Sequence, residues 1–197
     1  TPLVCVIDAD SIIEPDGLLR AAEPFMYDDD KLVAVGGAIR IVNGCVVKGG
    51  SLHRMGIARE MIPRIQIVEY LRAFLMNRVA NAHLNTLMLI SGAFGLFRRS
   101  TIVEMGGYRY DTVGEDLELV VRMHRFLRDN RRDYRIAFVP DIVCWTEAPA
   151  ALKGLDNQRA RWQQGAMETL QRHRGMIFNP RYGRIGLVAM PQIVLED

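Results

Sequence analysis

The sequence contains no run of roughly 18 or more apolar residues, so it predicts no complete membrane-spanning helix among its 197 residues. Cysteine is scarce, and the three residues Cys5, Cys45 and Cys144 are far apart and form no CxxC or cysteine–histidine pattern. Such spacing excludes a disulfide framework and the common zinc sites. We therefore expect three small, buried thiols in a protein of a reducing compartment.

A large excess of one charge is also absent, because 25 lysine and arginine residues nearly balance 23 aspartate and glutamate residues. Basic residues still gather in Arg122–Arg135 and Arg172–Arg184. We expect solvated helix faces there, with contact to phosphate or anionic lipid as the alternative. No regular pattern of aromatic residues alternates with these arginines, as single-stranded nucleic-acid sites require. Nucleic acid is therefore not an expected partner.

Strand and helix patterns alternate along the rest of the sequence, which is 49% hydrophobic and 24% charged, as in a globular segment. Apolar runs rich in valine and isoleucine predict strands over Leu3–Ile7, Leu32–Val42 and Ile136–Val139. Apolar residues at steps of three and four predict helices over residues 18–27, near 52–79, 115–127 and 155–172. The third strand is expected to end at Pro140. This alternation predicts an α/β domain.

Asp8-Ala9-Asp10 directly follows the first of these strands. In extended backbone, side chains two residues apart point the same way, so the two carboxylates are expected to converge. Hard oxygens at a strand end can hold Mg²⁺ or Mn²⁺, which neutralises phosphate. An isolated motif of this kind is more often a strand that runs into an Asx turn, so a metal site needs support from elsewhere in the chain.

Gly114-Glu115-Asp116 stands at the start of a predicted helix. Acidic residues in a first turn are favoured by the helix dipole, which by itself accounts for this pair. The alternative is functional, because a carboxylate held at a helix start beside a bound electrophile can act as a general base.

Gln158, Arg161 and Trp162 are spaced at i, i+3 and i+4, so they share one face of the last long predicted helix. An arginine offers a rigid donor fork to phosphate oxygens, and glutamine adds amide donors. An indole offers a flat face on which a sugar ring can stack. Tryptophan on a helix is usually core, but a core that includes arginine is unusual because a buried cation needs a partner.

Three motifs in this order resemble the DxD, (T/G)ED and QxxRW motifs of family 2 glycosyltransferases: Asp8-Ala9-Asp10, Gly114-Glu115-Asp116 and Gln158-Arg159-Ala160-Arg161-Trp162. The resemblance is to the membrane-embedded branch, which includes cellulose, hyaluronan, chitin and poly-N-acetylglucosamine synthases. Three further stretches also fit this branch: Ser91–Gly95, Glu69–Arg72 and Cys144–Pro149. The resemblance implies a GT-A-like mixed sheet flanked by helices, of which this chain would be the C-terminal part.

The resemblance also implies a role for each acidic residue. Asp8 and Asp10 would contact the donor diphosphate and its Mg²⁺ or Mn²⁺, mainly through Asp10. Asp116 would be the general base that deprotonates the acceptor hydroxyl, with Glu115 as its neighbour in the substrate site. The implied reaction is an inverting transfer from a nucleotide-sugar donor, expected to be UDP-linked, to a glycan or lipid-linked acceptor.

The remaining motif residues would bind substrate. By the same resemblance, Gln158, Arg161 and Trp162 would hold the diphosphate and border the acceptor site. Ser91 and Gly92 would line the floor of that site.

The resemblance has limits at both ends of the chain. Residues 1–184 are expected to be a partial catalytic domain that lacks the N-terminal nucleotide-binding half and binds donor weakly by itself. Residues 185–197 are expected to begin a membrane or interfacial segment, because an apolar run follows Arg181 and Arg184. The intact protein is then expected in the inner or plasma membrane with its catalytic domain in the cytoplasm.

One motif residue departs from the family pattern. Gly114 replaces the threonine common in processive synthases, which leaves processivity open.

Two alternatives belong to other functional classes. Asp8-Ala9-Asp10-Ser11-Ile12 also resembles the first motif of haloacid-dehalogenase-type phosphatases, in which the first aspartate attacks phosphate. Those enzymes need a lysine in a suitable setting, and none of Lys31, Lys48 and Lys153 has one. The second alternative is a non-catalytic fragment, which would expose apolar surface and self-associate.

Overall fold

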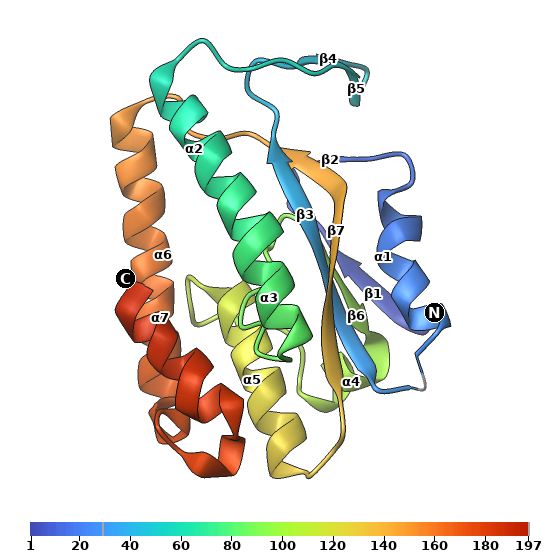
Figure 1. Ribbon diagram of the computed structural model, residues 1–197, viewed down its shortest axis with the longest axis vertical. Coiled ribbons are helices and arrows are strands. Elements are labelled where there is room, and N and C mark those ends of the chain that lie inside the picture. Colours follow the sequence, from blue (N-terminus) through green and yellow to red (C-terminus); the bar gives the residue numbers. More distant parts are fainter. Residues whose placement is uncertain (29, 197) are drawn as a thin grey trace.

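The computed structural model describes residues 1–28 and 30–196. Its central strands are β1 (Leu3–Val6), β2 (Ile12–Ile13), β3 (Leu32–Ile41), β6 (Gly95–Arg98) and β7 (Arg135–Thr146). They form one five-stranded sheet in the order β1-β6-β3-β7-β2 (Figure 1). Strands β3 and β7 are parallel, and the other neighbouring pairs are antiparallel, so the sheet is mixed.

Helices flank this sheet, with α1 (Gly17–Met26) to its right in Figure 1 and most of the others to its left. The other helices are α2 (Met61–Arg72), α3 (Arg78–His83), α4 (Arg99–Glu104), α5 (Glu115–Asp129), α6 (Leu152–Arg172) and α7 (Met190–Glu196). Two π-helical segments are η1 (Ala73–Asn77) and η4 (Ile185–Ala189), and two 3₁₀ segments are η2 (Arg174–Met176) and η3 (Pro180–Tyr182). A separate hairpin joins β4 (Val46–Lys48) and β5 (Ser51–Arg54).

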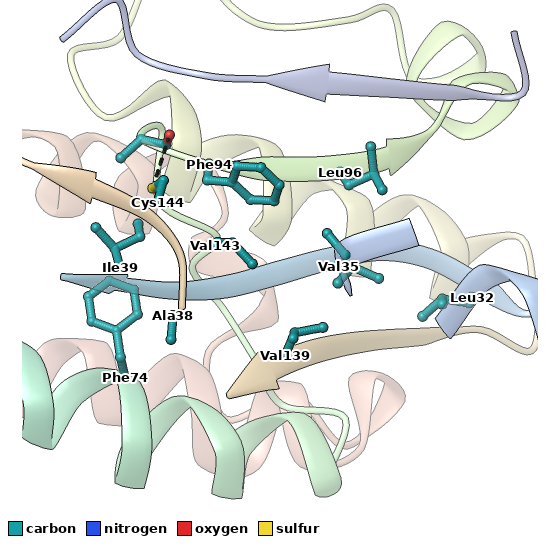
Figure 2. Close-up of a cluster of buried hydrophobic side chains, with 12 residues drawn as sticks. Leu32, Val35, Ala38, Ile39, Phe74, Phe94, Leu96, Val139, Val143 and Cys144 are labelled. Carbon is teal, nitrogen blue, oxygen red and sulfur yellow. Dashed lines mark hydrogen bonds between the residues drawn. The ribbon is translucent and has the colours of Figure 1, made fainter. Parts of the chain in front are cut away.

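The core lies against β3, which is buried along almost its whole length. A continuous apolar run of this kind is typical of a strand that is covered on both faces. Figure 2 shows Phe74 of η1 pointing toward Ala38 and Ile39 of this strand. Cys144 is buried in the same cluster, whereas Cys5 and Cys45 are partly buried, and all three thiols are free.

The helix expected from near Leu52 begins later in the structure. Ser51–Arg54 is strand β5, and the helix begins at Met61. Pro63 therefore lies in the first helical turn, where its missing N–H has no intrahelical partner to lose. The apolar stripe that suggested the helix faces solvent, since Met61 and Val68 are 74% and 65% exposed.

The strand expected to end at Pro140 instead continues to Thr146. Gly37 pairs with Val139, and the next residue, Ala38, pairs with Ile142. Pro140 and Asp141 therefore lie in a bulge, where a residue without an N–H costs no ladder hydrogen bond.

The apolar run that begins at residue 185 packs into the domain. Ile185, Ala189 and Met190 are buried in a cluster that includes Met88 and Leu170. No helix within the described ranges is long and apolar enough to cross a membrane. Residue 197 lies outside those ranges, and the proposed membrane or interfacial character of 185–197 stays a prediction.

A buried histidine joins α5 to the segment before β6. His124 is fully buried, with Nε2 at 2.9 Å from the Leu87 carbonyl oxygen and Nδ1 at 2.6 Å from the Tyr134 hydroxyl oxygen. A carbonyl only accepts, so Nε2 carries the proton and Nδ1 accepts from Tyr134. Burial lowers the pKa of His124 to about 4.

We expect acid to destabilise the fold through His124. An unfolded histidine takes up a proton near pH 6.5, whereas the folded one does so only near pH 4. Stability should therefore fall between these values, by about 3 kcal/mol from this residue, at about 1.4 kcal/mol per pKa unit. His124→Gln should show a flatter decline in unfolding free energy over this range, and exposed His53→Gln should not. Equal slopes in wild type and His124→Gln would contradict this account.

Candidate active site

One cavity of about 990 Å³ brings the predicted site residues together. Its walls come from the β1–β2 turn, the helices α2 and α3, the segment before β6, the start of α5, and α6. All nine residues selected from the sequence line it: Asp8, Asp10, Ser91, Gly92, Glu115, Asp116, Gln158, Arg161 and Trp162.

The two carboxylates of the first motif approach each other from a turn. Ser11 N donates to the Asp8 carbonyl oxygen at 3.1 Å, so Asp8-Ala9-Asp10 does not have the extended backbone expected from the sequence. Burial raises the pKa of Asp8, and the negative charges of Asp10 and Glu115 raise it further, while Arg161 lowers it. This end of the cavity therefore concentrates negative charge, which a cation would relieve.

Asp116 occupies the first turn of α5, and its carboxylate accepts two backbone hydrogen bonds. Leu117 N donates to Oδ1 at 2.7 Å, and Gly92 N donates to Oδ2 at 3.2 Å. Burial raises the pKa of Asp116, and these two N–H groups and the charge of Arg78 act in the opposite direction. The bonds fix the carboxylate in place, and a fixed, desolvated carboxylate has the properties of a general base.

The loop between η1–α3 and β6 forms the floor under Asp8 and Asp116. A Cβ atom at Gly92 would lie 3.3 Å from Asp8 Oδ1, so this glycine keeps space open beside that carboxylate. Ser91 lines the cavity next to it. The Ser91–Gly92 segment thus lies next to both Asp8 and Asp116.

The face of α6 that the sequence selected is not packed core. Trp162 is 46% exposed, and the Arg159 guanidinium lies 5.6 Å from its ring centroid. Arg159 also pairs with Glu69 of α2 and so ties the two helices together. Gln158 Oε1 is buried without a hydrogen-bond partner, so a polar group is left available at the cavity wall.

Two glycines allow α6 to approach the start of α5. A Cβ atom on Gly165 would lie 2.6 Å from Gly114 Cα, and one on Gly114 would lie 2.7 Å from Gly165 Cα. Neither position has room for a side chain. The glycine at position 114 is therefore explained by its contact with Gly165.

We expect Gly165→Ala to move α6 away from Asp116. The methyl group must displace backbone, which costs about 1–3 kcal/mol of stability, and a shift of about 1 Å in the site can lower turnover about 100-fold. Gly175→Ala is the matched control, because nothing lies within 4 Å of its added Cβ. Thermal unfolding of both variants and turnover of both in the full-length protein should be measured. Unchanged turnover in Gly165→Ala would show that this contact does not position the site.

Sequence analysis missed Arg78, which also lines the cavity, whereas Tyr70 lies in the stretch Glu69–Arg72 that it had noted. The apolar periodicity of this helix drew attention to residues 61, 65, 68, 71, 75 and 79 and passed over the polar residues between them. The signal that could have found Arg78 is its i, i+4 spacing from Phe74, which lets a guanidinium lie over a ring.

A model of the family described as "Glycosyltransferase like family 2" matches residues 1–165. The chain belongs to this family. It is 32% identical over 169 residues to the poly-beta-1,6-N-acetyl-D-glucosamine synthase of Staphylococcus aureus (strain COL), which covers 86% of this chain and 36% of that protein. The corresponding synthase of Staphylococcus epidermidis is 31% identical over the same shares. The chain thus spans about a third of the length of these relatives.

The fold also resembles a solved glycosyltransferase. A mannosyltransferase from Pyrobaculum calidifontis, in complex with GDP-Man and Mn2+, superposes with a TM-score of 0.55 at 18% identity, over 98% of this chain and 48% of that one. The GT-A-like mixed sheet and the assignment to the glycosyltransferases, both predicted from the motifs, are confirmed. The phosphohydrolase alternative is not favoured, and no lysine lines the cavity within the described part of the chain.

Proposed function

We propose that the protein containing this chain transfers a sugar from a UDP-linked donor to a hydroxyl group of a glycan or lipid-linked acceptor, with inversion at the anomeric carbon. The observation that carries the proposal is the gathering of both acidic motifs around one cavity, with Asp8, Asp10 and Asp116 in its wall and Gly92 next to both Asp8 and Asp116. The names of the relatives support sugar transfer as the reaction class.

The chemistry follows from these positions. Asp116 accepts the proton of the acceptor hydroxyl, and the hydroxyl oxygen forms a bond to the anomeric carbon of the donor. The bond from that carbon to the diphosphate oxygen breaks on the opposite face, and the electron pair leaves with the nucleoside diphosphate. Glu115, which is exposed beside Asp116, lines the same cavity, and its charge acts on Asp8.

The donor set fits a magnesium or manganese ion that the substrate helps to hold. No group of three or more histidine, cysteine, aspartate or glutamate side chains suited to a metal occurs in the described ranges. Mg²⁺ in phosphate-transfer sites is usually bound by one or two carboxylates, substrate phosphates and water, and Asp10 with Asp8 provides such carboxylates. A divalent cation bound there would neutralise charge that develops on the departing diphosphate.

The exposed face of α6 completes the substrate site. Arg161 lies near Asp8, and its donor fork suits diphosphate oxygens, with Gln158 as a further polar contact. The half-exposed indole of Trp162 offers a stacking surface for the acceptor sugar. Ser91 and Gly92 form the floor of the cavity next to Asp8 and Asp116.

We place the intact protein at the cytoplasmic face of the inner or plasma membrane, as the arginines before residue 185 favour.

The isolated chain is expected to self-associate, because apolar side chains of α2 such as Met61, Ile65 and Val68 are exposed. Gel filtration of the isolated chain tests that expectation, and a monodisperse monomer would contradict it.

A donor screen tests the proposed function. The full-length protein in membranes is incubated with single nucleotide sugars, including UDP-N-acetylglucosamine and GDP-mannose, and release of free nucleoside diphosphate is measured. We expect release with one UDP-sugar in the presence of Mg²⁺ or Mn²⁺. A protein that instead forms a covalent aspartyl-phosphate would revive the phosphohydrolase alternative.

A further inference from the structure

An arginine that none of the three motifs contains faces the cavity beside the general base. Arg78 is the first residue of α3, and its guanidinium carbon lies 3.9 Å from the ring centroid of Phe74. Phe74 is 3% exposed and is held in the core cluster shown in Figure 2. The side chain of Arg78 is therefore held by packing against a fixed ring, with its charged end at the cavity wall.

The backbone before Arg78 makes this placement possible. Residues 73–77 form the π-helical segment η1, and the amide of Arg78 donates to the Ala73 carbonyl oxygen. A π turn inserts one residue into an α-helix, so it rotates the following side chains by about 100° relative to a regular helix. Such insertions are frequent at functional sites. Without the π turn at residues 73–77, Arg78 would lie on a different face of the helix.

Two of the four arginines in the described cavity wall act on different acids. Arg161 lowers the pKa of Asp8, whereas Arg78 lowers that of Asp116. Yet Arg78 forms no ion pair within 4.0 Å in the portion of the chain that the structure describes, and its pKa is lowered to about 10 by burial. A desolvated guanidinium without a close carboxylate is costly, so its donors are available to a ligand.

The charges around Arg78 indicate the chemistry of that ligand. Arg78 and Asp116 carry opposite charges that act on each other, so the space between them suits a neutral, hydroxyl-rich group. The wall beside Arg78 also includes the amide side chains of Asn77 and Asn81. Asp8 and Asp10, with Arg161 whose charge acts on Asp8, suit a diphosphate and its cation instead.

We propose that Arg78 binds the acceptor sugar, donating hydrogen bonds to an oxygen adjacent to the hydroxyl that Asp116 deprotonates. The acceptor sugar then has two hydrogen-bonded contacts, one with Arg78 and one with Asp116, which align its attacking oxygen with the donor. This role rests on the proposed function, since it assigns Arg78 to the acceptor half of that same site.

Hydrolysis of the donor separates an acceptor role from a donor role, because water replaces the sugar acceptor in that reaction. The full-length protein is assayed with UDP-N-acetylglucosamine, with and without a β-1,6-linked N-acetylglucosamine oligosaccharide, as wild type, Arg78→Met, Arg78→Lys and Arg64→Met. Arg78→Met keeps a stem that can pack on Phe74 but removes the donors. Arg64→Met is the matched control, because Arg64 is an exposed residue of α2 outside the cavity.

We expect Arg78→Met to lower kcat/KM for the acceptor about 10- to 100-fold, as for loss of a charge-assisted hydrogen bond. Donor hydrolysis and the KM for donor should stay within about twofold of wild type. Arg78→Lys, which keeps the charge but not the fork, should recover part of the transfer, and Arg64→Met should match wild type.

Two results would overturn the role of Arg78 in an active enzyme. Equal loss of transfer and hydrolysis, with weaker donor binding, would make Arg78 a donor contact. A lower unfolding temperature in both Arg78 variants, with all rates reduced together, would make it structural. If Arg78→Met does not fold, the ratio of transfer to hydrolysis in Arg78→Lys decides, and an unchanged ratio overturns the proposal. A wild-type protein that neither transfers nor hydrolyses any nucleotide sugar would overturn the proposed function itself.

Discussion

Asp116→Asn in the full-length protein is expected to lower sugar transfer by about 10²- to 10⁴-fold, the usual cost of removing a general base. Its amide cannot accept the proton of the acceptor hydroxyl. Affinity for the donor should hardly change, because the proposed donor contacts are Asp8, Asp10 and Arg161, which also line the cavity, and not Asp116. Steady-state kinetics with varied donor and acceptor, and donor titration by calorimetry, measure the two effects separately.

The variant also changes two hydrogen bonds, so its stability needs a separate measurement. The Asp116 carboxylate accepts from both Gly92 N and Leu117 N, and asparagine keeps one acceptor oxygen. One backbone N–H then faces an amide NH₂ group, which should cost about 1–3 kcal/mol. Asp156→Asn is the control, because Asp156 is exposed on α6 and outside the cavity. Near-normal transfer by a folded Asp116→Asn enzyme would remove Asp116 from the role of base.

The site was predictable because its residues stand at the ends of elements. Asp8 and Asp10 follow β1, Glu115 and Asp116 begin α5, and Ser91 and Gly92 precede β6. Short polar motifs at such positions stay visible in a sequence, since the neighbouring strand or helix has a clear pattern of its own. The carboxylates of Asp8 and Asp10 were predicted to converge in extended backbone, but the motif lies in a turn.

The parts that sequence analysis missed depend on tertiary structure. The exposed stripe of Met61, Ile65 and Val68 has the spacing of a core face, so periodicity alone identifies a helix but not the side it buries. The path of β7 through Pro140 depends on a bulge opposite β3. The spacing of Arg78 from Phe74 could suggest a contact with the ring, but the place of Arg78 at the cavity depends on a π turn that the sequence pattern does not reveal.

Asp10→Ala is expected to weaken donor binding on the order of 100-fold in Mn²⁺, because a bound divalent cation contributes several kcal/mol to a phosphate site. In the absence of a divalent cation, the variant and the wild type should bind donor with nearly equal, low affinity. Calorimetric titration of UDP-N-acetylglucosamine with and without Mn²⁺ gives both comparisons. The variant should fold normally, since Asp10 is exposed in the turn after β1.

The metal dependence of binding distinguishes a ligand from a residue that touches the diphosphate directly. Loss of a direct contact would weaken binding by the same factor with and without Mn²⁺, whereas loss of a metal ligand acts only when the cation is present. Asp141→Ala, in the β7 bulge and outside the cavity, should behave as wild type under both conditions. Excess chelator should abolish transfer by the wild-type enzyme, and full transfer in chelator would exclude Asp10 as a ligand to an essential metal. Because Asp116 is not a proposed ligand of the cation, its variant should keep the Mn²⁺ dependence of donor binding that Asp10→Ala loses.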